Sequence, residues 1–149
     1  MLEQRLRQVL DSNQTVKIAT SGAGLSPWIA AAYFAPDGLF CLEVMIESGG
    51  NTLANIRSNP QVAVMIDNGD AFAPFAQAEG RAEVDDQDGA AERFRTDLAA
   101  KAPAAAPLVG LPNLVPVRIR IETWRLTDVS QGWIPARQLS SRAAPGATG

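Results

Sequence analysis

Histidine is absent from the 149-residue sequence, and cysteine occurs only once, as Cys41. Without histidine the chain has no Ser-His-Asp or Cys-His pair, no histidine-ligated zinc and no imidazole base. A single cysteine excludes an intrachain disulfide, which agrees with a reducing compartment. These absences weigh most heavily against a hydrolase, and we expect no metal site.

Long apolar runs and an excess of positive charge are also missing. No hydrophobic stretch approaches the length of a membrane span, and the charged N-terminal segment lacks the apolar core of a signal peptide. The formal net charge is -3 and the basic residues are scattered, so no surface is indicated for a polyanion such as DNA. We therefore expect a cytoplasmic protein that binds neither nucleic acid nor a membrane.

The length and composition predict one domain with a substantial core. Of the residues, 46% are hydrophobic and 19% are charged, which is ordinary for a globular protein. The domain is expected to span residues 1–140. The segment 141–149, rich in alanine and glycine, has the composition of a disordered tail.

Strand-like runs dominate the pattern along the chain. The expected strands are residues 15–20, 26–35, 39–46, 61–67, 72–84 and 115–129. Helices are expected over residues 2–10, before the stop at Asn59-Pro60 and after the acidic run 85–89, and residues 103–112 form a connector or a lid. This order predicts a mainly β fold with helices (α+β), a small antiparallel barrel of about six strands with helices on its surface. It also permits an open α+β sheet.

Residues 47–64 join two of these strands through a short helix. Gly49 and Gly50 let a ligand approach the backbone, and Asn51 is placed to cap the helix. A helix that begins behind Ser48 and the two glycines directs free N–H groups and the positive end of its dipole toward whatever precedes it. That arrangement favours a phosphate. On local grounds alone, an ordinary strand-to-helix turn accounts for the same residues.

Three motifs stand out against this background. They are Asp37-Gly38-Leu39-Phe40, the run Asn55-Ile56-Arg57-Ser58-Asn59-Pro60-Gln61-Val62, and Glu79-Gly80-x-Ala82-Glu83-Val84. Together with the element order over residues 2–129, they resemble the flavin-binding split-barrel family related to pyridoxamine 5'-phosphate oxidase. The resemblance implies a six-stranded antiparallel split β-barrel with peripheral helices. It also implies a homodimer whose cofactor clefts lie between subunits, with FMN preferred over a deazaflavin or haem.

The same resemblance assigns the flavin phosphate to the turn before the short helix. The residues implied are Ser48, Gly49, Gly50, Asn51 and Thr52. Many family members carry a basic residue in this region, and this chain has none there. Backbone N–H groups and neutral side chains are then expected to hold the phosphate, with Lys17, Arg57, Arg81 or an arginine of the partner as compensating cations.

The flavin ring is assigned to the second strand. The residues expected to line it are Ala30, Ala31, Ala32 and Tyr33, with Trp28 and Phe34 as further aromatic candidates. Three consecutive small residues leave room for a flat group against the backbone, although close packing of a helix requires the same. Aromatic residues in a strand also commonly belong to the core.

Trp133 and Arg137 lie four residues apart after a glycine turn. They are expected to close over the cofactor of either subunit, the tryptophan by stacking and the arginine by pairing with phosphate. The alternative is a tryptophan that covers one end of the barrel. Glu43 is expected to face outward from its apolar strand, and Cys41 to be a small buried hydrophobe.

No side chain stands out as an acid, base or nucleophile, which fits chemistry carried by a flavin. The sequence therefore predicts an FMN-dependent oxidoreductase that acts on a small molecule. The alternatives are a non-catalytic flavin or haem binder or sensor, and a barrel dimer without a cofactor.

Overall fold

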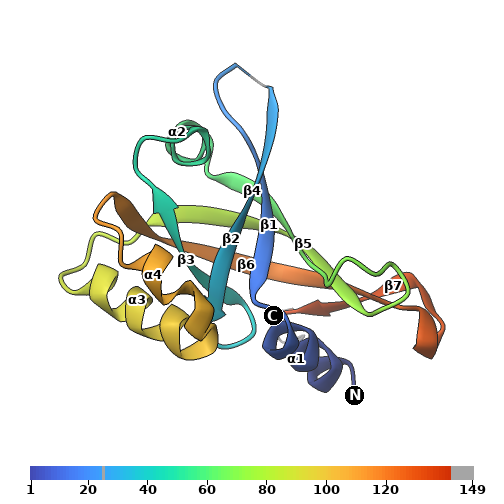
Figure 1. The fold of residues 1–149 in the computed structure, drawn as a ribbon. Coiled ribbons are helices and arrows are strands. Elements are labelled where there is room, and N and C mark those ends of the chain that lie inside the picture. The colour runs from blue at the N-terminus through green and yellow to red at the C-terminus, as the bar shows by residue number, and fades with distance from the viewer. Residues whose placement is uncertain (25, 142–149) are drawn as a thin grey trace, which may run out of the picture.

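One antiparallel sheet closes on itself at the centre of the molecule (Figure 1). The structure, a computed structural model, describes residues 1–24 and 26–141. The strand order is β3-β2-β1-β4-β5-β6-β7, and β3 also pairs with β6, which closes a six-stranded barrel and leaves β7 as an extension. The strands are β1 (Thr15–Ser21), β2 (Pro27–Pro36), β3 (Cys41–Glu47), β4 (Gln61–Ile66), β5 (Phe75–Val84), β6 (Leu114–Asp128) and β7 (Trp133–Ser140).

Alternating side chains fill this barrel. Val16 and Ile18 of β1 are fully buried, and the residue between them is exposed, as expected for a strand with one face on the core. Trp124 of β6 is also fully buried, and its Nε1 donates a hydrogen bond to the carbonyl oxygen of Leu39 at 2.7 Å. The predicted barrel is confirmed, and the open α+β sheet is wrong because β6 closes the edge of β3.

Helices cover the outside of the barrel (Figure 1). The helical segments are α1 (Leu2–Ser12), α2 (Asn51–Ser58), α3 (Ala90–Lys101) and α4 (Ala106–Val109), with short 3₁₀ turns η1 (Pro103–Ala105) and η2 (Val129–Gln131). α1 buries Leu6, Val9 and Leu10 against the main core, at the spacing of one helix face. Phe94 and Leu98 of α3 form a second core cluster with residues of β2, β3 and α4.

Some element boundaries differ from the prediction. β3 begins at Cys41 rather than at residue 39, because the N–H of Asp37 donates to the Cys41 carbonyl at 2.8 Å and closes a turn there. β5 begins at Phe75, because the N–H of Phe72 donates to the Asp70 side chain in the preceding turn. β7 has no counterpart among the predicted strands, since Pro135 and polar residues obscure its alternation. Of the predicted tail 141–149, residues 142–149 lie outside the described residues.

β2 and β3 separate along much of their length, and this separation positions the site. They pair only where Phe34–Pro36 meets Leu42–Val44. Residues 27–33 of β2 pair with β1 on their other side, whereas residues 45–47 of β3 pair with β6. Within the described chain, one edge of β2 thus lacks a strand partner, and its backbone polar groups are open to a ligand. None of the described helices is long and apolar enough to cross a membrane.

Candidate functional site: a cleft where the barrel splits

A cleft of about 340 Å³ opens where β2 and β3 diverge. Its first wall is the unpaired part of β2. The lining residues of this wall are Trp28, Ala30, Ala31, Ala32 and Tyr33. The structure therefore brings the predicted alanine run and Tyr33 to one surface. Phe34 is instead fully buried in the main core.

The second wall is formed by the end of β3 and the first turn of α2. Met45 and Ile46 contribute apolar surface, and Gly50, Asn51 and Thr52 bring the start of the helix to the cleft. No side chain caps α2, so the N–H groups of its first turn remain available to a ligand.

Ser48 and Gly49 lie in the exposed turn just before α2 and do not line the cleft. The N–H of Ser48 donates to the carbonyl oxygen of Asn113 at 2.8 Å, which ties the turn to the start of β6. Ser48 and Gly49 thus shape the turn rather than the cleft surface in this protomer.

α2 is held in place from below by the asparagines of its motif. The Nδ2 of Asn55 donates to Thr20 Oγ1 at 3.0 Å, and the Nδ2 of Asn59 donates to Ser21 Oγ at 3.2 Å. A Cβ on Gly22 would lie 2.3 Å from Asn55 Oδ1, so only glycine permits this contact. These motif residues position the helix start at the cleft and do not themselves line it.

The third wall comes from α4 and the segment that follows it. Leu108, Val109, Leu111, Asn113 and Leu114 line this side, of which the sequence had indicated only a connector or lid. Arg95 of α3 holds the wall: its Nε donates to the Val109 carbonyl at 3.0 Å, and its Nη2 to the Leu111 carbonyl at 3.5 Å. Sequence alone offers little signal for these residues, because a loop rich in proline and alanine shows no periodicity.

Charge is scarce in the cleft. Among the described residues that line it, Glu47 is the one charged side chain. Of the predicted compensating cations, Lys17 pairs with Asp67 at 2.6 Å, and Arg81 lies on a separate groove over β4, β5 and β6. Arg57 is exposed in the last turn of α2, opposite the end that faces the cleft.

Trp133 and Arg137 do not line the cleft of their own protomer. Trp133 is only 5% exposed and belongs to the main core, and the Arg137 guanidinium lies 5.0 Å from the centre of its ring. Their predicted contact with a cofactor in the partner's cleft remains a prediction. In this protomer Trp133 packs into the main core of the barrel.

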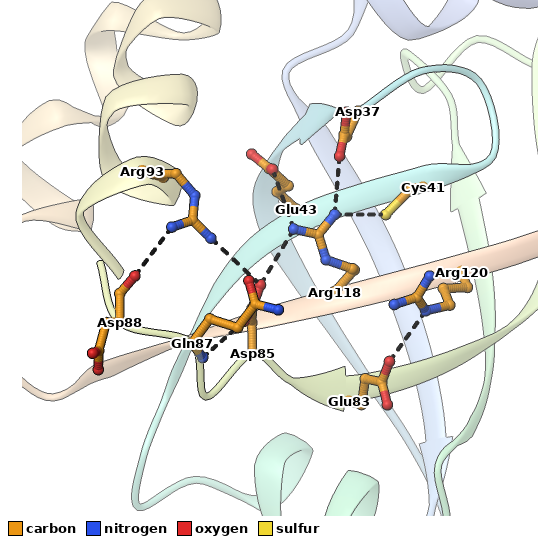
Figure 2. Close-up of polar contacts among 10 residues, drawn as sticks. All are labelled: Asp37, Cys41, Glu43, Glu83, Asp85, Gln87, Asp88, Arg93, Arg118 and Arg120. Atoms are coloured by element: carbon orange, nitrogen blue, oxygen red, sulfur yellow. Dashed lines mark hydrogen bonds and ion pairs between the residues drawn. The ribbon is translucent and has the colours of Figure 1, made fainter. Parts of the chain in front are cut away.

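A polar cluster beside α3 contains none of the residues that line the cleft (Figure 2). Arg118 of β6 occupies its centre. Its Nη1 lies 3.0 Å from Asp37 and 3.3 Å from Cys41 Sγ, and its Nη2 lies 3.3 Å from Asp85 and 3.8 Å from Glu43. One cation therefore joins β3, β6 and the turn that precedes α3.

Glu43 faces away from the barrel core, since its neighbours Leu42 and Val44 are buried in that core, but it is not solvent-exposed as an outward-facing carboxylate was expected to be. Glu43 is 6% exposed because α3 covers this part of β3. Arg118 supplies a partner for its carboxyl group. Cys41 is half-buried rather than fully buried. Burial raises the pKa of its thiol in spite of the nearby Arg118, which disfavours the reactive thiolate.

A closed, split antiparallel barrel with a cleft at the split is thus the class of fold on which this site is built. The family model described as pyridoxamine 5'-phosphate oxidase matches residues 2–128. The chain belongs to this family, and the resemblance inferred from its motifs is confirmed. No match is found among curated proteins.

Solved structures share the fold at low sequence identity. The heme-binding protein from Mycobacterium smegmatis is similar with a TM-score of 0.75 at 15% identity, over 94% of this chain and 58% of that one. HutZ, the heme storage protein from Vibrio cholerae, has a TM-score of 0.69 at 19% identity, over 85% of this chain and 94% of that one.

A protein related to general stress protein 26, of the pyridoxinephosphate oxidase family, from Clostridium acetobutylicum, has a TM-score of 0.71 at 15% identity, over 93% of this chain and 96% of that one. This chain spans only 58% of the length of the M. smegmatis protein. At these identities the likeness shows the fold alone.

Proposed function

We propose that the protein is a homodimeric, flavin-dependent oxidoreductase that acts on a small molecule, with the flavin ring in the cleft between β2, α2 and α4. The single observation that carries the proposal is the run Ala30–Ala32 on an unpaired strand edge, facing the apolar wall of α4. A flat heteroaromatic ring suits such a mainly apolar surface of small side chains. The ring nitrogens and carbonyl groups of a flavin can also form hydrogen bonds with the open N–H and C=O groups of a strand edge.

FMN is the flavin that the resemblance implies. The cleft residues fit the ring of FMN and its phosphate group differently. The ring meets small and aromatic side chains, of which Tyr33 and Trp28 offer faces for stacking. The phosphate meets free N–H groups at the start of α2 and no cation of the described protomer. The residues present therefore fit the ring and do not fit the phosphate.

When bound, a flavin supplies hydride or single-electron transfer. The side chains of this protein would bind and orient it: β2 and α4 would enclose the ring, and Asn51, Thr52 and Asn113, which line the same cleft, would be available for neutral hydrogen bonds with its side chain. Leu108 and Leu111 on the α4 side would limit the access of water to the ring. A general acid or base is not required of the cleft.

Exposed apolar surface around the mouth of the cleft is the reason for proposing a homodimer. Trp28 and Ile29 on the open edge of β2 are 45% and 65% exposed, and Leu108 and Leu111 are 49% and 43% exposed. A partner related by twofold symmetry would cover such surface and complete the cleft. Size measurement in solution is expected to give a dimer at micromolar concentration, and a stable monomer would contradict the shared cleft.

Haem binding is the second candidate, favoured by the names of two structural relatives. Tyr33 and Met45 are the cleft side chains of types that ligate haem iron, and the chain has no histidine to do so. The propionates of haem would meet the same lack of cations as a phosphate. The cleft therefore supports a flavin better.

Absorbance of the purified protein separates these possibilities. A flavin spectrum, or binding of added flavin, supports the proposal, whereas a Soret band supports haem. A colourless protein that binds neither supports a barrel dimer without a cofactor. Ala31→Phe fills the slot at an exposed position and is expected to abolish flavin binding, whereas Ala100→Phe on the exposed face of α3 is the matched control.

A further inference from the structure

The cleft carries a negative charge at the start of α2, which is the end where a phosphate would bind. Glu47 closes β3 directly before the turn into α2, and its side chain lines the cleft. Its Oε1 lies only 3.3 Å from where a Cβ on Gly50 would be, so the carboxylate stands beside the residue that caps α2. An anion of the protein itself therefore lies at the helix start.

This negative charge has no partner among the described residues. The ion pairs of residues 1–24 and 26–141 do not include Glu47, and no lysine or arginine of these residues lines the cleft. The side chain is exposed to the solvent of the cleft mouth. Water and salt both weaken its field there, and the salt screening length is about 8 Å at physiological ionic strength.

The helix dipole does not outweigh this charge. The start of an α-helix is equivalent to roughly half a positive charge, and its effect falls off within the first turn. Glu47 carries a full negative charge beside Gly50 and already interacts favourably with the positive end of that dipole. A phosphate brought to the free N–H groups of α2 would gain the smaller attraction and meet the larger repulsion.

The neutral groups around Glu47 suit a different ligand chemistry. Asn51, Thr52 and Asn113 can donate to or accept from hydroxyl groups, and the Glu47 carboxylate accepts hydrogen bonds only. Hydroxyl groups of an uncharged polyol chain would satisfy both kinds of group. An anionic end group would leave the carboxylate without a donor.

We propose that this cleft binds a flat heteroaromatic ligand whose side chain is uncharged, a flavin without phosphate, and that Glu47 sets this preference by repelling anions from the start of α2. The inference rests on the proposed flavin function and deepens it by naming the cofactor class. It makes Glu47 a specificity-determining residue of the cleft.

Riboflavin and FMN test this proposal, because they differ only in the phosphate. In fluorescence titrations at low ionic strength, the wild-type protein is expected to bind riboflavin at least roughly tenfold more tightly than FMN. Added salt should narrow that difference by strengthening FMN binding. Glu47→Gln should raise FMN affinity by about tenfold and change riboflavin affinity less than about twofold.

Glu92→Gln is the matched control, since it removes the same charge from an exposed position of α3 outside the cleft. It should leave both affinities unchanged. If wild-type protein binds FMN as tightly as riboflavin, or Glu47→Gln leaves the ratio unchanged, the specificity proposal is overturned while the flavin function stands. If neither flavin binds, both proposals are overturned.

Discussion

Glu43 of β3 and Arg118 of β6 are direct partners in the pairing of the two strands that close the barrel, and Glu43 Oε2 lies 3.8 Å from Arg118 Nη2. The other oxygen, Oε1, is buried without a hydrogen-bond partner among the described residues. Burial, followed by the neighbouring carboxyl group of Asp97, raises the pKa of Glu43 to about 8. The folded protein therefore holds a proton that the unfolded chain releases near pH 4.5.

This relationship predicts a pH-dependent stability. Because the pKa is higher in the folded state, the stabilisation is complete below about pH 4.5 and is lost as the pH rises to about 8 and beyond. The free energy of unfolding at pH 8.5 is expected to be lower than at pH 5.5 by on the order of 3 kcal/mol. Urea unfolding at a series of pH values measures it.

Glu43→Gln should remove most of this slope, since the amide cannot ionise. Glu83→Gln is the control: Glu83 is an exposed carboxylate that pairs with Arg120 at 3.1 Å, and its loss should leave the slope intact. An unchanged slope in Glu43→Gln would mean that another group carries the pH dependence.

Arg95 is expected to keep the α4 wall closed over the cleft. Arg95→Gln removes its contacts with the Val109 and Leu111 carbonyls, so the wall should open more often. Hydrogen exchange at the Gly110 and Leu111 amides is expected to become faster by roughly fivefold, which corresponds to about 1 kcal/mol for the lost hydrogen bonds. Flavin should also bind severalfold more weakly.

The control for Arg95 is Arg93→Gln, because Arg93 lies on the same helix and pairs with Asp85 instead of the α4 wall. Its loss should leave the exchange of Gly110 and Leu111 as in the wild type. Equal exchange rates in wild type and Arg95→Gln would show that apolar packing alone holds α4.

Gly80 is predicted to be intolerant of any side chain. It sits at the bulge between β5 and β6, where a Cβ would lie 2.9 Å from the Arg120 carbonyl oxygen and 3.0 Å from Ile119 Cγ2. Gly80→Ala is expected to cost about 1 to 3 kcal/mol of unfolding free energy. Gly49→Ala meets nothing within 4 Å and should change stability little; equal melting temperatures for the two variants would contradict the packing argument.

Thr52→Lys would add a cation at the start of α2. Thr52 lines the cleft and is 7% exposed, so the lysine stem must run along the cleft wall to bring its ammonium group to the mouth. FMN affinity is expected to rise about tenfold relative to riboflavin affinity, because only the phosphate gains a charged partner. An equal gain for both flavins would point to a change in cleft shape instead of charge.

Ser48→Asp tests the turn that the sequence assigned to the phosphate. A carboxylate there should lower FMN affinity at least roughly tenfold in protein that binds FMN, with an unchanged circular dichroism spectrum, since Ser48 is exposed. Unchanged affinity would place the phosphate elsewhere.

The sequence by itself determined most strands of the barrel, because alternation along strands such as residues 115–129 and turn residues such as Asp37-Gly38 are local signals of buried faces and chain reversals. It also indicated the alanine run Ala30–Ala32 and the helix start at Asn51 as parts of one site, through the family resemblance of their neighbourhood. Both features follow from residues close together in the chain.

Only the tertiary structure decided which side chains meet. Divergence of β2 from β3 created the cleft, docking of α4 by Arg95 supplied its third wall, and packing of α3 buried Glu43 beside Arg118. Glu47 is the charged residue of the cleft because the end of β3 and the start of α2 lie side by side. Apart from the contact of Glu47 with the start of α2, these contacts join residues far apart in the chain, and their geometry depends on how helices pack against a closed sheet, which periodicity along one segment does not encode.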